Sequence, residues 1–153
     1  MIEENSPNEA NKFFSGIWSC SYMYPSQKHA GEDVSEHYVN VYNKGQTLVF
    51  ESIPNIEESY LLVRLTINGE LATGIWQETT SPTGAYKGAV YEGAVQLIID
   101  KGKKRMDGVG VGPTLKDGKT TIYPSKWEMR RIGQKKAVAS AVKTHSTTGR
   151  ATL

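Results

Sequence analysis

The chain lacks the features that mark several classes of protein. It has one cysteine and three histidines in 153 residues, so an intrachain disulfide and a cysteine-rich zinc site are both excluded. No apolar run approaches the roughly 18 residues that a membrane helix needs. The N-terminus (MIEENSPNEANKFF) is acidic where a secretory signal would be basic and then apolar. We therefore expect a soluble, cytoplasmic protein with no metal site, no other cofactor and no membrane partner.

Outside the C-terminal tail the chain has no large excess of positive or negative charge. The net charge is +2, and residues 134–153 hold four basic residues and no acidic one, which leaves −2 for the rest of the chain. A nucleic-acid-binding domain concentrates many Lys and Arg on one face, so we expect no specific nucleic-acid partner. The length suits a single domain. We divide the chain into an N-terminal leader (1–15), a β-barrel domain (16–132) and a basic, flexible tail (133–153).

Between the two ends of the chain the apolar residues alternate with a period of two, which is typical of strands, and the helical period is absent. Leu61, Val63 and Leu65 alternate with other residues, and Asn68-Gly69 follows them as a strong signal for a two-residue hairpin turn. The pattern predicts eight strands, at residues 16–24, 34–42, 47–52, 59–67, 71–80, 86–99, 105–111 and 120–132. The residues between the last two strands, 112–119, are expected to form a loop rich in Gly, Pro and Asp.

Short connections make strands that follow one another antiparallel. Eight such strands in up-and-down order close into a small barrel, which removes both sheet edges and encloses an interior. The predicted fold class is therefore all-β, an eight-stranded antiparallel up-and-down barrel; a β-sandwich, the alternative, usually needs longer crossovers. Asn5-Ser6-Pro7 supplies a cap and a first-turn proline, so a short N-terminal helix is expected before the barrel.

Two segments at the ends of the barrel sequence resemble a known superfamily. Gly16-Ile17-Trp18 opens the first predicted strand, and Arg130 and Arg131 lie in the last. This arrangement resembles the calycins, the superfamily of lipocalins and fatty-acid-binding proteins. The resemblance implies that Trp18 and Arg130 form a structural plug at one end of the barrel, by stacking and cation–π contact.

The middle of the chain resembles a second group. Residues 72–97 (ATGIWQETTSPTGAYKGAVYEGAVQL), with SEHYV at 35–39 and WEMR at 127–130, look like a domain that follows helix-turn-helix regions in some bacterial transcription regulators. The resemblance implies a bacterial, sensor-type barrel, and this chain departs from those regulators because it lacks a helix-turn-helix segment. In size and strand order it is also similar to the cyclic-nucleotide-binding barrels of bacterial anti-phage effectors.

The candidate ligand contacts are aromatic and polar residues on strands that are expected to line the interior. Trp76, Glu78 and Thr80 share one face, and a buried Glu78 needs a partner, which Arg64 supplies if it points inward. The alternation on 59–67 favours the opposite face inward, which leaves Arg64 in solvent, and the inward face of 34–42 is undecided. The rings and hydroxyls of the full set suit a planar ligand: Tyr22, Tyr24, His37, Tyr38, Arg64, Trp76, Glu78, Thr80, Tyr86 and Tyr91.

Catalytic constellations are not evident in the sequence. Cys20 and His37 lack an orienting third residue, and the glycines at 108–112 are not followed by the helix of a phosphate-binding loop, so they read as a flexible strand end. The leading interpretation is a non-enzymatic barrel that binds a small, nucleotide-like molecule and acts as a sensor. Two alternatives stay open: a protein-interaction or homo-oligomeric structural module with a packed interior, and an isomerase-like enzyme using Glu78 and a tyrosine as base and acid.

Overall fold

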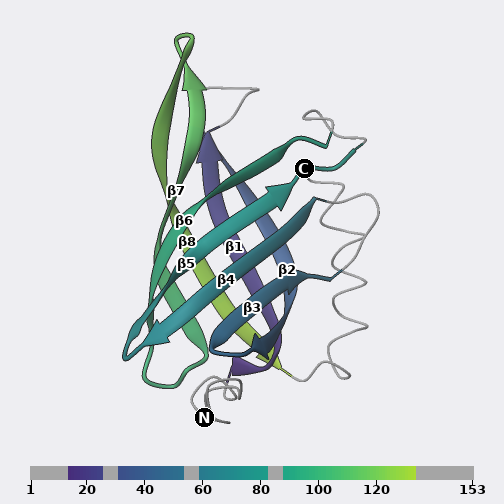
Figure 1. The fold of residues 1–153 in the computed structure, drawn as a ribbon, viewed down its shortest axis with the longest axis vertical. Coiled ribbons are helices and arrows are strands. Elements are labelled where there is room, and N and C mark those ends of the chain that lie inside the picture. The colour runs from purple at the N-terminus through teal and green to yellow at the C-terminus, as the bar shows by residue number, and fades with distance from the viewer. Residues whose placement is uncertain (1–13, 26–30, 54–58, 83–87, 134–153) are drawn as a thin grey trace.

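The chain folds into one closed antiparallel barrel. The structure is a computed structural model that describes residues 14–25, 31–53, 59–82 and 88–133. Each strand pairs with its neighbours along the chain, and β1 also pairs with β8, which closes the barrel (Figure 1). The strands are β1 (Gly16–Pro25), β2 (Glu32–Lys44), β3 (Thr47–Ser52), β4 (Tyr60–Asn68), β5 (Leu71–Thr79), β6 (Val90–Ile99), β7 (Arg105–Lys116) and β8 (Lys119–Gly133).

The prediction of an eight-stranded antiparallel barrel is confirmed. The predicted N-terminal helix and the basic tail lie outside the described residues, as does Tyr86. Below, the lower end of the barrel is the end where β1 begins, and the upper end is the end where β1 stops (Figure 1).

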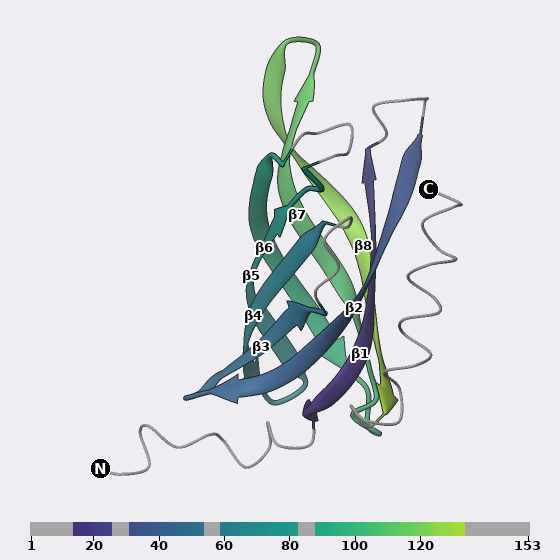
Figure 2. The same ribbon diagram turned by 90° about the vertical axis from the view of Figure 1, so that its right-hand side faces the viewer.

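The loop predicted at 112–119 is wrong. β7 continues to Lys116, and Asp117-Gly118 turns the chain directly into β8 with positive φ at both residues, 52° and 75°. These dihedrals fit a type I′ hairpin turn, which matches the twist of the two strands it joins. The resulting hairpin reaches beyond the upper end of the barrel (Figure 2). β7 pairs with β6 only as far as Val111, and β8 pairs with β1 only as far as Trp127. Residues 112–126, here called the arm, therefore pair with no strand other than β7 and β8.

Each strand of the arm carries a proline, Pro113 in β7 and Pro124 in β8. Proline has no N–H, so within a strand it fits only where its nitrogen points away from the paired partner. Each free edge of the arm therefore lacks one backbone donor. This arrangement protects an exposed edge from pairing with another strand.

The lower end of the barrel is filled by apolar side chains. The Trp18 ring meets Phe50 edge-on, with 5.8 Å between ring centroids, and its indole nitrogen donates to the Phe14 carbonyl at 2.8 Å. Fully buried residues surround them on the alternate, inward positions of the strands: Val41, Leu48, Leu65, Ala72, Leu97, Met106 and Met129. This end of the interior therefore holds its own side chains.

Glycines on β6 and β7 make room for two tryptophans at the upper end. A Cβ atom at Gly110 would overlap the Trp127 indole, and one at Gly93 or Gly112 would overlap that of Trp76. The glycine run at 108–112 is therefore an internal part of β7, and the expectation of a flexible strand end is wrong. Small residues on β6 and β7 therefore leave room for large rings from the neighbouring strands β5 and β8.

We predict that Gly110→Ala destabilises the protein by about 1–3 kcal/mol, because the Trp127 ring is fully enclosed and has no free space to move into. Urea unfolding followed by circular dichroism measures this change. Gly102→Ala is the matched control, because its nearest neighbour is the flexible Asp100 side chain at 3.5 Å and the cost there should be near zero. Equal stability of the two variants would contradict the packing described.

Candidate functional site

Polar side chains gather inside the barrel at its upper end. His37 on β2 and Ser52 on β3 are buried, and His37 is only 4% exposed. Glu78 on β5 enters the same space with 15% of its side chain exposed. Period-two alternation puts these residues inside, since each lies two residues along its strand from a buried apolar residue or an inward-facing tryptophan. We call Tyr22, Ser35, His37, Ser52, Ser59 and Glu78 the polar cluster.

The imidazole of His37 is the centre of the polar cluster. Its Nδ1 lies 3.2 Å from the Ser52 hydroxyl oxygen. Its Nε2 lies 3.2 Å from the Tyr22 hydroxyl, 3.1 Å from that of Ser35 and 3.4 Å from Oε2 of Glu78. Both ring nitrogens are thus engaged by side chains from neighbouring strands.

The donors and acceptors around His37 indicate which ring nitrogen carries a proton. A carboxylate only accepts, so His37 Nε2 carries the proton that faces Glu78. When the ring is neutral, Nδ1 accepts from the Ser52 hydroxyl. The Ser52 oxygen in turn accepts the backbone N–H of Leu61 at 2.8 Å. A continuous chain of hydrogen bonds therefore runs from the β4 backbone through Ser52 and His37 to Glu78, and it fixes the imidazole ring.

Glu78 is held in its ionised form. Burial alone raises the pKa of this carboxyl, but hydrogen bonding and charge attraction from His37 oppose burial, and hydrogen bonds from Tyr22 and Ser59 add to them. The Ser59 hydroxyl donates to Oε2 at 2.9 Å. The net pKa of Glu78 is lower than its ordinary value. The upper interior therefore contains a buried negative charge at neutral pH.

Aromatic rings form one wall of this space. The Tyr22 ring stacks on Trp127, with 4.4 Å between centroids and 13° between planes, and on its other side it is parallel to the His37 ring at 5.8 Å. Trp76 lies 5.9 Å from Trp127 and donates its indole N–H to the Val111 carbonyl at 3.2 Å. Burial raises the pKa of Tyr22 well above its ordinary value, with the charge of Glu78 adding to the effect, so its phenol stays a neutral donor.

The geometry does not supply an accessible nucleophile among the described residues. In a serine hydrolase the nucleophile and the acid meet opposite nitrogens of the histidine. Ser52 and Glu78 do face opposite nitrogens of His37, but Ser52 is buried and its oxygen also accepts the Leu61 N–H. Ser35 faces the same nitrogen as Glu78. Cys20 is the cross-strand partner of His37. Burial raises the pKa of its thiol, and the nearby carboxylates of Glu78 and Glu36 raise it further, so it stays an unreactive thiol.

Several predicted site residues lie elsewhere. Arg64 is exposed on the outer face of β4, so the partner of Glu78 is His37 instead. Tyr38 is on the outer face of β2, where it packs with Ile17 and Ile53.

The remaining predicted residues lie near the upper end. The Thr80 hydroxyl donates to the Ala89 carbonyl at 3.1 Å and closes the β5–β6 connection. Tyr91 is the cross-strand partner of Glu78, and Tyr24 is half-buried near the end of β1. The structure thus brings together Tyr22, His37, Trp76 and Glu78 from the predicted set.

At the lower end, Arg131 rather than Arg130 lies opposite Trp18. The Arg131 guanidinium donates to the Ser15 carbonyl at 2.8 Å and so ties β8 to the start of β1. Arg130 points outward, with 60% of its side chain exposed, and its guanidinium binds Glu128 at 2.8 Å.

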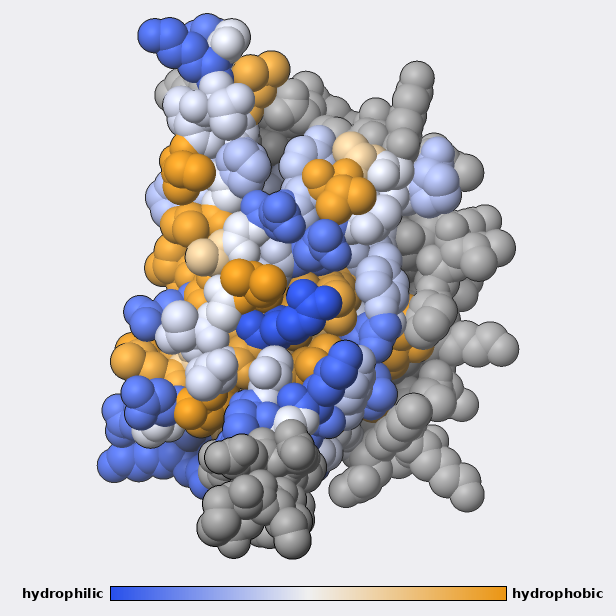
Figure 3. Space-filling model, in the orientation of Figure 1, coloured by the Kyte–Doolittle hydropathy of each residue, from blue (hydrophilic) through white to orange (hydrophobic). Residues whose placement is uncertain are grey.

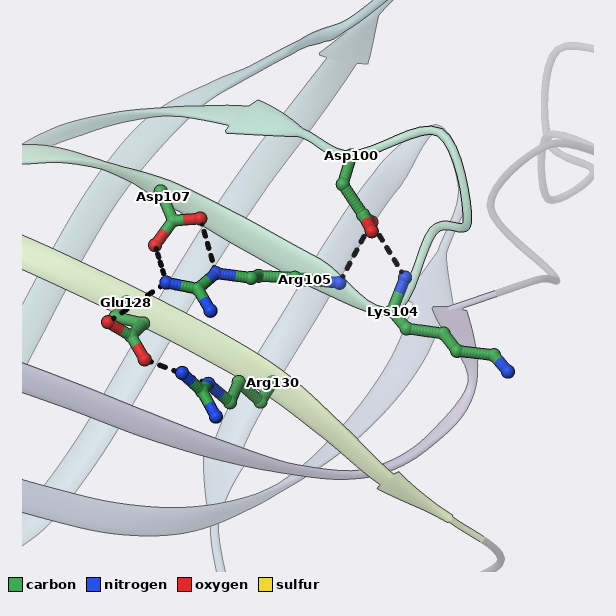
Figure 4. A network of polar contacts seen from close by, with 6 residues as sticks. All are labelled: Asp100, Lys104, Arg105, Asp107, Glu128 and Arg130. Atoms are coloured by element: carbon green, nitrogen blue, oxygen red, sulfur yellow. Dashed lines mark hydrogen bonds and ion pairs between the residues drawn. The ribbon is translucent and has the colours of Figure 1, made fainter.

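The outward arginine belongs to a surface network (Figure 4). Arg105 binds both carboxylate oxygens of Asp107, at 2.7 and 3.1 Å, and reaches Glu128 at 3.3 Å. Asp100 accepts the backbone N–H groups of Lys104 and Arg105 at the adjoining turn. Exposed ion pairs of this kind contribute little to stability, so the network marks a solvated face.

Sequence reasoning missed the three serines and the part played by Trp127. Ser35 lies two residues before His37 and therefore on the same strand face, so the alternation of the strand could have identified it. Ser52 and Ser59 flank the β3–β4 connection, and only the barrel geometry brings them to His37 and Glu78.

The described residues offer neither a metal-binding cluster nor a membrane-spanning helix. No group of three or more His, Cys, Asp or Glu converges there in a way that could hold a metal ion. Within the same ranges, none of the helical structure is long and apolar enough to cross a membrane.

We predict that Glu78→Gln lowers the free energy of unfolding by roughly 1.5–3 kcal/mol at pH 7, because it removes charge-assisted hydrogen bonds. The pKa of Glu78 is lower in the folded protein than the roughly 4.3 of an unfolded chain, so ionised Glu78 stabilises the fold above that value. This contribution is lost as the pH falls through the folded pKa. Urea unfolding between pH 7 and pH 3 should show the two proteins converging on the acid side.

Glu92→Gln, at an exposed carboxylate on β6, is the control and should leave a smaller difference at every pH. A gap between wild type and Glu78→Gln that stays constant down to pH 3 would contradict an ionised, hydrogen-bonded Glu78.

Comparison with known proteins does not place the chain in a family: no family model matches it, and no curated protein matches it. The closed eight-stranded antiparallel barrel is consistent with a calycin-like barrel. Function is therefore argued below from the geometry of the polar cluster.

Proposed function

We propose that this protein binds a small molecule at the upper end of the barrel, against Trp76 and the polar cluster. The observation that carries the proposal is the buried His37–Glu78 pair, 3.4 Å apart, in a barrel whose lower end is filled with apolar side chains. A buried carboxylate and its hydrogen-bond partner are often no more stabilising than apolar residues of the same volume. The fold alone therefore gives no reason for this pair, whereas ligand recognition does.

The chemistry of the site favours a planar ligand that donates hydrogen bonds. Glu78 is an acceptor, Tyr22 is a donor, and the indole of Trp76 offers a flat apolar surface. Among the described inward-facing positions at the upper end there is no Lys or Arg that would pair with a phosphate. A nucleobase or nucleoside fits these groups better than the phosphate end of a nucleotide does.

A sensor role in the bacterial cytoplasm follows from the resemblance of the chain to the barrel domains of helix-turn-helix regulators. In that role the barrel reports the presence of its ligand and performs no reaction on it. The resemblance, the absence of an accessible nucleophile in the described residues and the fixed imidazole together favour a binding protein over an enzyme.

We predict that adenosine, guanosine or cytidine quenches the tryptophan fluorescence of the protein, and that Trp76→Phe removes this change. Glu78→Gln should weaken binding by about 10- to 100-fold, the cost of losing one hydrogen bond to a charged group. Titration with each nucleoside and with its 5′-monophosphate measures both effects, and the monophosphates should bind more weakly.

Trp18→Phe is the control for the fluorescence titration, because Trp18 lies at the packed lower end and its loss should leave the quenching intact. Native mass spectrometry of the purified protein extends the test to ligands carried through purification. If neither method detects a bound small molecule, or if the quenching survives Trp76→Phe, the assigned site is wrong.

A second candidate function, an isomerase-like reaction, is favoured by one observation. Ionised Glu78 and the neutral Tyr22 phenol are hydrogen-bonded to each other and both contact His37, so a base and an acid share one network. In this reaction Glu78 removes a proton from one ligand atom and Tyr22 returns a proton to another. The proton held by Glu78 then passes to the Tyr22 phenolate along their hydrogen bond, which restores both groups. Deuterium incorporation into a co-purified ligand in D₂O, present for wild type and absent for Glu78→Gln, would favour this function over simple binding.

A further inference from the structure

The outer surface of the barrel is divided by charge. The outward positions of β5, β6 and the middle of β7 form a strip in which Glu92 is the single charged residue. We call this the uncharged strip, and it comprises Leu71, Thr73, Ile75, Gln77, Thr79, Val90, Glu92, Ala94, Gln96, Ile98, Val109 and Val111. Apolar side chains gather over these strands in the space-filling view (Figure 3).

Strand register makes the apolar members of the strip neighbours. Leu71 lies opposite Ile98, and Ala94 lies between Ile75 on one side and Val111 on the other. Ile75, Ile98 and Val109 are each more than half exposed, at 51%, 59% and 52%. The hydrogen-bonded pair Thr73–Gln96 lies between these two apolar rows. Clustered exposed apolar side chains mark an interaction site more often than scattered single residues do.

The arm extends the same surface upward. Val111, Pro113 and Leu115 alternate along β7 and so share one face, and Ile122 lies opposite Pro113 on that face. Leu115 and Ile122 are the most exposed large apolar residues described, at 68% and 67%. A two-stranded ribbon is marginally stable in water without further packing, so an arm with this apolar face gains stability from a partner.

We propose that the uncharged strip and the apolar face of the arm pack against the same surface of a second copy of this chain. A two-fold contact sets a surface against itself, so charges near its centre would face like charges. A strip with one carboxylate avoids that repulsion. A different partner protein would instead gain specificity from complementary charges, which this strip does not offer.

The mode of contact follows from the prolines. Pro113 and Pro124 each remove a backbone donor from a free edge of the arm, which disfavours pairing of those edges with another strand. Association therefore uses the side-chain face, with the two sheets stacked about 10 Å apart.

The size of the surface agrees with a weak homodimer. In the strip β5 and β6 each present about nine residues and β7 presents about three. With strands about 4.8 Å apart and about 3.3 Å per residue, the strip covers roughly 330 Å², and the arm adds roughly 130 Å². Two copies then bury roughly 900 Å² in projection, and side-chain relief makes the accessible area larger. Specific interfaces begin at about 1,200 Å², so we expect association in the micromolar range.

Sedimentation velocity of the full chain between about 5 and 200 µM tests the proposal. The wild type should shift from monomer to dimer across this range. Val109→Lys and Ile75→Lys, each tested alone, should weaken the dimer at least 10-fold, because each places a charge inside the apolar contact. Leu115→Lys should weaken it as well if the arm takes part.

Val34→Lys is the matched control: it makes the same change at a position 46% exposed on the outer face of β2, across the barrel from β6, and it should leave the dimer unchanged. Thermal unfolding checks that every variant is folded. A wild type that stays monomeric throughout overturns the proposal and leaves the strip to a different protein. A dimer that resists both Val109→Lys and Ile75→Lys overturns it too, and a dimer that resists Leu115→Lys alone removes the arm from the contact.

Discussion

Pairing of β1 with β8 is the constraint on which the rest of the structure depends. Once these strands join, every strand has an inside and an outside, and alternate residues are assigned to one or the other. The pairing stops at Tyr22 and Trp127, the two rings that stack on each other at 4.4 Å. Beyond that point β8 leaves the barrel with β7 and becomes the arm. Closure therefore defines the interior, the polar cluster inside it and the surface outside it.

The two ends of the interior are filled by different kinds of side chain. At the lower end apolar side chains fill the space, and Trp18 and Arg131 connect the barrel wall to residues just before β1. At the upper end the glycines on β6 and β7 have no side chains, and the rings of Trp76 and Trp127 occupy the space that side chains would fill. This exchange brings flat rings beside His37 and Glu78, so an aromatic wall and a hydrogen-bonding group face the same space.

The polar cluster is costly for a small barrel and is fully connected. His37 has partners on both nitrogens, and Glu78 has His37 and Ser59. A network in which each member is satisfied holds a single geometry, and the low dielectric of the interior strengthens its hydrogen bonds. That rigidity is useful for recognising one ligand. The outer strip has a different character, because it combines exposed apolar side chains with a single charged group and is suited to a broad protein contact.

The sequence by itself determined the barrel and most of its strand positions, since alternation such as Leu61, Val63 and Leu65 and turn signals such as Asn68-Gly69 are local. It also indicated Glu78, Trp76 and Tyr22 as interior residues. Only the tertiary structure decided that His37, and not Arg64, is the partner of Glu78, because cross-barrel contacts depend on strand register and shear. The same limit applies to the arm: its Pro and Gly residues are typical of a loop, and pairing between β7 and β8 overrides that local preference.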